Sequence, residues 1–370
     1  MGNKTNKGTY LELRIARLLL SQNVAPFVNV WFRTGIEHSS ISQPDIDVMG
    51  CVFLPECTNF YIYYDCKSGD SKVINRILML SGLRGKIPPG PITYIRRKTA
   101  LSIKQYALQN GIKITNLKQI EEKEKKFVHP LFKNHFPSVS DIDVHELWLS
   151  TKGKNKKNRI GNILNYLEYD FWGEKPFTRL KRTLAALQLF ESTIRETNLT
   201  QIEKDILICL ILRKLIFSIL DAASYLSLLS KDEILLFVRD SLISENIEPL
   251  EYQKIIESTA QFIYELYGDS SKGPLRKEDY YIPPPDYTEE LISLLQRTID
   301  LGYALPWILL GFDGLVFEKN VRNRDEVASY ILTLIDSRYM ADIKSWFRSI
   351  KLFLENRNNT LKKWRGWKDL

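Results

Sequence analysis

The sequence predicts an α/β domain in the first third of the chain and an all-α domain in the remainder. Two observations carry this prediction. One amphipathic segment and three consecutive β-rich segments precede an alternation of strands and helices. From Ile160 onward, apolar residues recur with helical spacing instead. At 370 residues the chain is long enough for two domains that each bury a core.

The N-terminal elements follow from local periodicity. Apolar residues between Thr9 and Ser21 recur at the spacing of one helical face. Three β-rich segments come next, and the polar loop after the first favours a hairpin-like return into the second. These strands are predicted over Pro26–Thr34, Pro44–Met49 and Phe60–Lys67. A helix (Ile74–Gly82), a strand (Ile92–Ile95), a helix (Thr99–Asn110) and a strand (Ile112–Thr115) complete the order αβββαβαβ.

A charge-dense stretch marks the predicted domain boundary. Residues 118–129 carry little apolar content, so we expect an α/β domain over 1–120, a charged linker over 121–159 and a helical domain over 160–370. The basic run 152–159 is interpreted as a solvated loop in preference to a phosphate-contacting one. Helices are predicted over Ile160–Phe171, Phe177–Glu196, Gln201–Leu229, Asp232–Ile243, Tyr252–Tyr267, Thr288–Ile299 and Asp325–Phe353.

Charge and cysteine usage restrict the class of protein. The net charge is +8, and residues 1–130 hold 19 Lys and Arg against 10 Asp and Glu, which favours a polyanionic partner. The four cysteines show no CxxC spacing, which suits a reducing cytosol. The N-terminus lacks an apolar signal segment, and the most apolar run, Ile206–Leu212, is far shorter than the roughly 20 residues of a membrane span. We therefore expect a cytoplasmic protein with a buried helix at that run.

Three side chains on neighbouring predicted strands form the central motif: Asp47, Asp65 and Lys67. Alternate residues of a strand share a face, so Asp65 and Lys67 point the same way. Acids at such positions are costly to bury without partners, and a divalent cation satisfies two of them at once. The spacing therefore indicates a metal-dependent site.

The segments Lys7–Glu12, Pro44–Asp47 and Asp65–Lys67 resemble the PD-(D/E)XK nuclease superfamily, in particular the Mrr-type restriction endonucleases and the archaeal Holliday junction resolvases. The resemblance covers residues 7–116. It implies a restriction endonuclease-like αβββαβ core, with a mixed central sheet flanked by helices, ahead of the all-α C-terminal domain.

The resemblance also implies the role of each residue. Asp47 and Asp65 would bind Mg²⁺, which Mn²⁺ would replace, together with the backbone carbonyl of Cys66. Lys67 would orient or deprotonate the attacking water, and Glu12 would hold a metal-bound water. The motif context favours Asp47 over Asp45 as the principal ligand, which leaves Asp45 as a second ligand or an exposed acid. Asp65 stands where many members of the superfamily have Glu.

Basic residues around the motif are candidates for nucleic-acid contact as a group. They are Arg33, Lys72, Arg76, Arg96, Arg97 and Lys98. The run Arg96–Lys98, at the end of a predicted strand, is the best single candidate for contact with the phosphate backbone. A second cluster, Asp141, Asp143, His145 and Glu146, is interpreted as a loop leading into a capped helix in preference to a metal loop.

The function expected from these features is a Mg²⁺-dependent endonuclease that hydrolyses DNA phosphodiester bonds, with restriction or anti-phage defence as the role suggested by fold-level analogy. Two alternatives stay open: a Holliday junction resolvase or transposon-end nuclease, and a catalytically silent DNA-binding or scaffold protein. The helical domain would recognise a target or a protein partner. Cutting both strands with one site per chain favours a homodimer.

Overall fold

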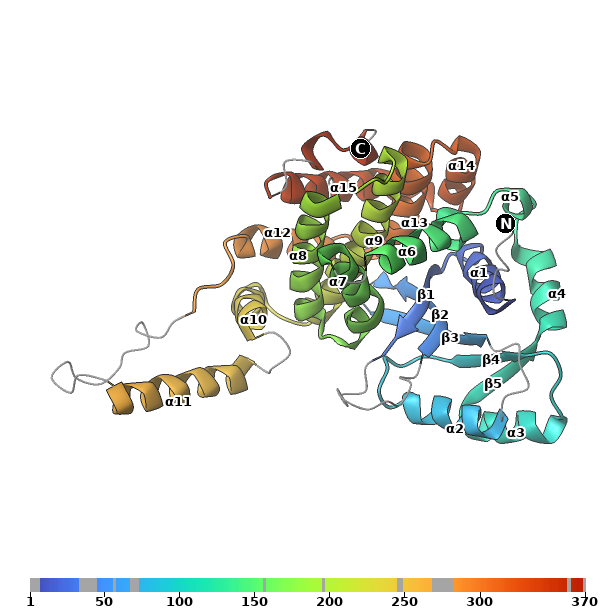
Figure 1. The fold of residues 1–370 in the computed structure, drawn as a ribbon, viewed down its shortest axis with the longest axis horizontal. Coiled ribbons are helices and arrows are strands. Elements are labelled where there is room, and N and C mark those ends of the chain that lie inside the picture. Colours follow the sequence, from blue (N-terminus) through green and yellow to red (C-terminus); the bar gives the residue numbers. More distant parts are fainter. Residues whose placement is uncertain are drawn as a thin grey trace.

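The five β-rich segments form one mixed sheet in the computed structural model of the chain (Figure 1), which describes residues 7–32, 45–55, 58–66, 73–155, 158–194, 197–244, 249–267, 282–357 and 361–368. The strands are β1 (Ala25–Trp31), β2 (Asp45–Phe53), β3 (Asn59–Cys66), β4 (Ile92–Arg96) and β5 (Ile112–Asn116), and they lie in that order. The first three are antiparallel, and β4 and β5 continue parallel to β3. The predicted class, an α/β region followed by helices, is confirmed.

Each face of the sheet is covered by a different set of helices. On one face, α1 (Lys7–Leu20) packs Ile15 and Leu19 against Val48 of β2 and Tyr64 of β3. Residues one position further along each strand point the other way, because strand side chains alternate. That second face packs against α2 (Val73–Leu83) and α3 (Leu101–Gln109) over β3 to β5, and against C-terminal helices over β1 and β2. Figure 1 shows α2 and α3 below the sheet.

The segment predicted to be a charged linker is largely helical. It contains α4 (Leu117–Phe127), α5 (Leu131–Asn134), η2 (Ser138–Ser140) and α6 (Ile142–Lys154). One buried residue, Ile120, and an ion pair from Arg14 of α1 to Glu124, with Nε 2.9 Å from Oε1, hold α4 to the α/β region. A helix with a single fully buried residue has too few buried positions for periodicity to detect. Residues 152–154, interpreted as loop, form the last turn of α6.

The interpretation of Asp141 as part of a capped helix start is confirmed. Its carboxylate accepts a hydrogen bond from the backbone N–H of Asp143, 3.0 Å away, as the N-cap of α6. Arg322 and Arg324 also donate to the same carboxylate, at 3.0 and 3.3 Å. The acid is therefore occupied by structural partners.

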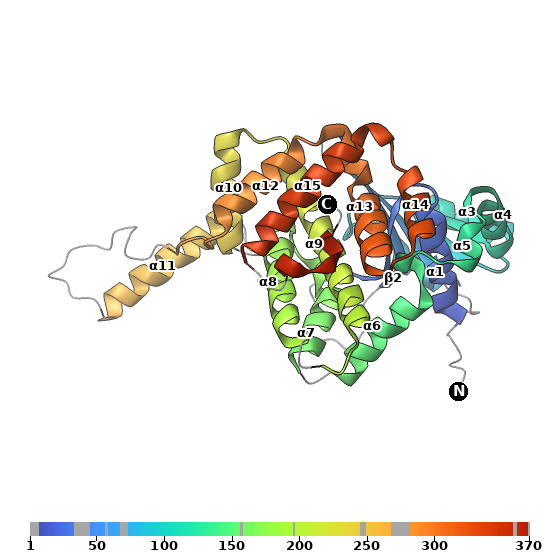
Figure 2. The ribbon, with the colours of Figure 1, turned by 90° about the horizontal axis from the view of Figure 1, so that it is seen from above.

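The C-terminal region is helical, as predicted, but its last third is divided into more short helices than the sequence predicted. The helices are α7 (Arg159–Asn165), η3 (Tyr166–Asp170), η4 (Phe171–Gly173), α8 (Pro176–Ile194), α9 (Gln201–Leu226), α10 (Lys231–Ser244), α11 (Pro249–Tyr267), α12 (Thr288–Ile299), η7 (Gly302–Trp307), α13 (Ile308–Gly311), η8 (Phe312–Val321), α14 (Asp325–Thr333), η9 (Ser337–Tyr339), α15 (Met340–Glu355), η10 (Leu361–Lys363) and η11 (Arg365–Trp367). The prediction of one helix over Asp325–Phe353 was wrong, because Asp336 accepts a hydrogen bond from the Arg338 N–H and starts a new turn. Both ribbon views show α11 extending away from the body (Figures 1 and 2).

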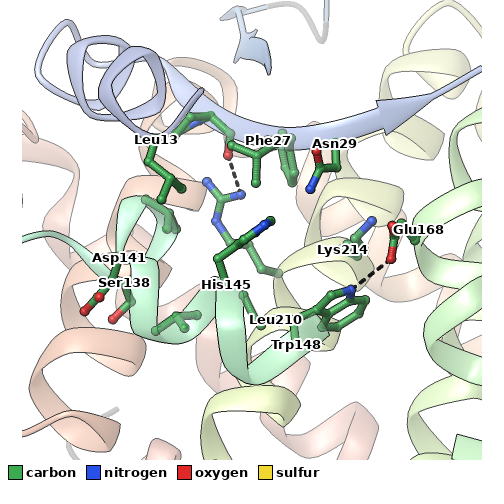
Figure 3. A pocket seen from close by; sticks show the side chains of 15 residues that line it. Leu13, Phe27, Asn29, Ser138, Asp141, His145, Trp148, Glu168, Leu210 and Lys214 are labelled. Atoms are coloured by element: carbon green, nitrogen blue, oxygen red, sulfur yellow. Dashed lines mark hydrogen bonds between the residues drawn. The ribbon is translucent and has the colours of Figure 1, made fainter. Parts of the chain in front are cut away.

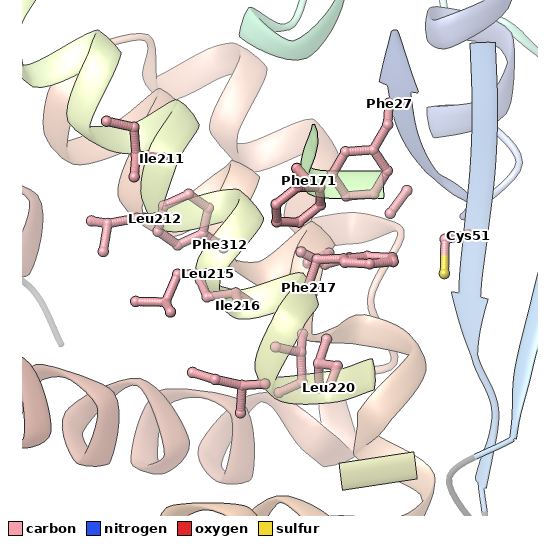
Figure 4. Packing of buried hydrophobic residues seen from close by; sticks show 14 of the residues in the cluster. Phe27, Cys51, Phe171, Ile211, Leu212, Leu215, Ile216, Phe217, Leu220 and Phe312 are labelled. Atoms are coloured by element: carbon pink, nitrogen blue, oxygen red, sulfur yellow. The ribbon is translucent and has the colours of Figure 1, made fainter. Parts of the chain in front are cut away.

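Helix α9 joins the helical region to the sheet. The run Ile206–Leu212 within it is buried apart from Leu210, which is partly buried, as the sequence predicted. Further along α9, Phe217 packs edge-to-face on Phe27 of β1, with ring centroids 5.2 Å apart, and on Phe53 of β2 at 5.6 Å (Figure 4). The apolar face of β1 and β2 is thus completed by residues nearly two hundred positions later in the chain.

A buried ion pair fixes the same junction. Arg213 of α9 pairs with Asp313 of η8, with Nε 2.8 Å from Oδ1, and donates to the Pro26 carbonyl of β1 at 2.8 Å. Its guanidinium also lies 4.4 Å from the Phe27 ring centroid.

No single helix of the described part is both long and apolar enough to cross a membrane. As a pair, only Thr288–Ile299 and Gly302–Val321 reach the length and composition of a span, and the two are bent by 98° relative to each other.

Candidate functional site

Asp47 and Asp65 lie opposite each other on adjacent strands. In the antiparallel pair β2–β3 Val48 faces Tyr64, so the next positions, Asp47 and Asp65, face each other as well. Their exposed fractions are 4% and 0%. Buried carboxylates require partners, because an unpaired charge in the interior is strongly destabilising. The structure therefore brings together the two acids that the sequence predicted as metal ligands.

The carboxylate of each acid accepts hydrogen bonds from a different group. The Asp47 Oδ2 accepts a hydrogen bond from the backbone N–H of Cys66. The Asp65 carboxylate accepts two bonds from Arg76 of α2, with Nε 2.9 Å from Oδ2 and one terminal nitrogen on Oδ1. Such bidentate pairs are among the strongest charge-assisted hydrogen bonds. Arg76, predicted as a phosphate contact, is thus the counter-ion of Asp65.

Several predicted site residues lie outside the described residues. These are Lys67, Arg33 and Lys72, together with the side chain of Asp45. Strand β3 ends at Cys66, the residue directly before Lys67. The Cys66 side chain itself is buried in the cluster under α1, so its thiol faces away from the face that carries Asp65 and α2.

Glu12 lies on α1. That helix begins at Lys7, so Glu12 falls in its second turn. Buried residues of α1 cover the sheet face of Val48 and Tyr64, whereas Arg76 reaches Asp65 from α2 on the other face. Glu12 is half-buried on the helix across the sheet from that ion pair.

Basic residues follow the strand next to the acids. Because β3 and β4 are parallel, their carboxyl ends lie at the same edge of the sheet, and Cys66 pairs with Ile95 there. Arg96 is half-buried at the end of β4, and Arg97 and Lys98 are exposed directly after it. Positive charge is therefore exposed to solvent at the edge of the sheet where Asp65 is buried.

The donor set fits a magnesium ion better than a zinc ion. No group of three or more His, Cys, Asp or Glu side chains gathers in the described ranges. Magnesium is commonly bound through one or two carboxylates plus waters and substrate phosphates, so Asp47 and Asp65 suffice as protein ligands. A cation at Asp65 would have to take over at least one oxygen that Arg76 now occupies.

A pocket that the sequence did not predict lies beside β1, with a volume of about 110 Å³ (Figure 3). Its lining comes from α1, β1, η2, α6, η3 and α9, and includes Asn29, His145, Trp148, Glu168 and Lys214. Burial lowers the pKa of His145, and it lowers the pKa of Lys214 to about 7 despite the opposing field of Glu168. Perturbed groups of this kind gather at functional sites.

Two features of the sequence signal the pocket in retrospect. Asn29 interrupts the run Phe27–Trp31, although Asn is depleted in strands. Lys214 follows the most apolar run of the chain, where an ionisable side chain has little access to water. Neither signal shows that the two residues meet, because 184 residues separate them in the sequence.

Comparison of the chain with protein-family models, with curated proteins and with solved structures finds no match.

Proposed function

We propose that the chain is a Mg²⁺-dependent endonuclease of the PD-(D/E)XK superfamily that hydrolyses DNA phosphodiester bonds. The observation that carries the proposal is the position of Asp47 and Asp65, opposed on two antiparallel strands of a mixed sheet. Lys67 is two positions after Asp65 in the sequence. Carboxylate pairs in this arrangement bind the hard cations that catalyse phosphoryl transfer.

Each residue of the proposed site would have a separate role. When bound at the two acids, the cation would activate water and neutralise charge on the scissile phosphate. The Cys66 N–H keeps the Asp47 carboxylate oriented. Arg96, Arg97 and Lys98 would hold the phosphate backbone at the carboxyl edge of β4, and Lys67 would orient or deprotonate the attacking water. Cys51 and Cys209 are free, buried thiols, which suits the proposed cytosolic setting.

A catalytically silent DNA-binding protein is the second candidate. It is favoured by Arg76, which occupies both oxygens of Asp65 and so meets the electrostatic requirement that a cation would otherwise meet. A Holliday junction resolvase or transposon-end nuclease would use the same site on a different DNA structure.

The test is cleavage of linear, supercoiled, methylated, branched and single-stranded DNA and of RNA, with Mg²⁺ or Mn²⁺. Lys67→Ala and Asp65→Asn should abolish cleavage while DNA binding persists, and Asp300→Asn, which alters an exposed acid, should cut normally. Preference for branched DNA would assign the resolvase function. Intact DNA binding with no cleavage of any substrate would favour the silent protein.

A further inference from the structure

We infer that the pocket beside β1 binds one planar, pyrimidine-sized heterocyclic ring through its hydrogen-bonding edge. Binding of this ring is the first step, and it depends on the pocket alone. The second step, that the ring is a base of the nucleic acid that is cut, rests on the proposed function.

The volume and walls of the pocket match a single ring. A cavity of about 150 Å³ lined by apolar side chains accommodates benzene, so about 110 Å³ with an open mouth suits one six-membered ring and not a fused pair. Apolar side chains form most of the lining, and the indole of Trp148 adds an aromatic wall. Besides Trp148, the apolar residues are Leu13, Pro26, Phe27, Val28, Val139, Val144 and Leu210.

Three of the polar lining residues gather at one end of the pocket. In Figure 3, Asn29, Lys214 and Glu168 lie together at the end of the pocket opposite Ser138 and Asp141. Glu168 is fixed there by Trp148, whose Nε1 donates to its Oε2 at 3.2 Å, and by Lys152 at 2.6 Å. A carboxylate acceptor, an amine and an amide thus converge from three separate elements.

The charge balance at this end favours an uncharged ligand. The Glu168 carboxylate already forms an ion pair with Lys152, so it adds no net charge that a charged ligand would have to balance. The Lys214 amine donates to the Leu167 carbonyl and lies 4.6 Å from the Phe171 ring centroid. A ring with adjacent N–H and C=O groups, such as a pyrimidine base, offers both a donor to Glu168 and acceptors to the amine and the amide.

Asn29 has unused hydrogen-bonding capacity. Its side-chain amide makes no hydrogen bond to any residue that the structure describes, although it lines the pocket. Its φ of 54° is left-handed within a strand, whereas Asn23 and Asn323, the other described non-glycine residues with positive φ, lie outside helices and strands. Backbone strain of this kind is typical of ligand sites, where it aims a side chain.

One lining residue of the pocket, Asn29, lies on the strand next to the one that carries Asp47. Val28 pairs with Val48 and Val30 with Ile46, so Asn29, whose left-handed φ interrupts the ladder, falls at the register position of Asp47 on the neighbouring strand. A base is joined to its phosphate by one sugar, so a nucleotide can place its base in the pocket and its phosphate near the acids.

Binding is tested with the chain of residues 1–370, without metal, by calorimetric titration with deoxycytidine, thymidine, deoxyadenosine and deoxyguanosine. Deoxyribose and inorganic phosphate serve as probes that lack the ring. We expect one saturable site that prefers the pyrimidine nucleosides. Two substitutions remove one hydrogen-bonding group each: Asn29→Gly, in which glycine tolerates the left-handed backbone, and Lys214→Met. Each should weaken binding about tenfold, which corresponds to the free energy of one hydrogen bond. Asn323→Gly makes the same change at an exposed positive-φ position and should bind normally.

The outcomes separate this inference from the proposed function. No saturable binding of any nucleoside, or equal binding by purines, overturns the inference, as does phosphate binding in place of nucleoside binding. Nucleoside binding without cleavage of any substrate supports the pocket and contradicts the nuclease. If cleavage is observed, Asn29→Gly should alter the base preference beside the cut, and an unaltered preference would overturn the second step.

Discussion

Lys214→Met should change the pH dependence of stability in a way that follows from burial of the amine. In the folded chain the pKa of Lys214 is lowered by burial from 10.5 to about 7. Between these values the unfolded chain binds a proton that the folded chain does not hold. The free energy of unfolding of the wild type therefore rises with pH across this window. Methionine has a similar shape and no titrating group.

The size of the effect follows from the same shift. Each pH unit between about 7 and 10 contributes about 1.4 kcal/mol, because one pKa unit corresponds to that difference between protonation states. Over the whole window the change is at most about 4 kcal/mol. The methionine variant should therefore gain most over the wild type near pH 7, and the gain should shrink toward pH 10.

The measurement is urea denaturation, followed by tryptophan fluorescence, of both proteins at pH 7, 8, 9 and 10. Other titrating groups cancel in the difference between variant and wild type. Lys231→Met, at an exposed lysine of α10, is the matched control and should give a difference that does not depend on pH. A constant difference between Lys214→Met and the wild type would refute the argument.

Three other changes address the junction and the candidate site. Arg213→Met leaves the buried Asp313 without its partner and should lower the free energy of unfolding by about 3–5 kcal/mol. Adding Asp313→Leu should recover most of that loss in urea denaturation, and an additive further loss would contradict this account. Phe217→Ala should cost about 3–5 kcal/mol in the same assay, and a cost under about 1 kcal/mol would show that the sheet does not depend on it. Arg76→Ala should tighten Mn²⁺ binding in calorimetry by releasing Asp65, and Asp65→Asn should abolish that gain; weaker binding in Arg76→Ala would contradict the competition.

Local information predicted the α/β region well. Strands β1 to β5 are rich in β-branched and aromatic residues and are separated by polar or glycine-containing segments, so their order could be predicted. The opposition of Asp47 and Asp65 follows from two neighbouring strands in one hairpin-like unit. These features depend on residues close together in the chain, and periodicity detects them.

The features that were missed depend on distant partners. The charged segment of α4 is held by an ion pair between Arg14 and Glu124, 110 positions apart. Arg76 could be assigned to solvent or to Asp65 only after the fold had placed α2 beside β3. The pocket requires Asn29 and Lys214 to converge across the junction of the two regions. No spacing within the sequence encodes these contacts, because tertiary packing decides them.

The packing of Phe217 and its neighbours on β1 and β2 bears on how such a chain can be divided. Strand β1 is an edge of the sheet, and its apolar face is covered by side chains from α9 and η4. A gene fragment encoding only residues 1–120 would keep both acids but expose Phe27 and Phe53 beside an unpaired strand, the combination that promotes aggregation. Recombination that exchanges the helical region would therefore have to supply an equivalent cover, so the two regions are expected to be inherited together.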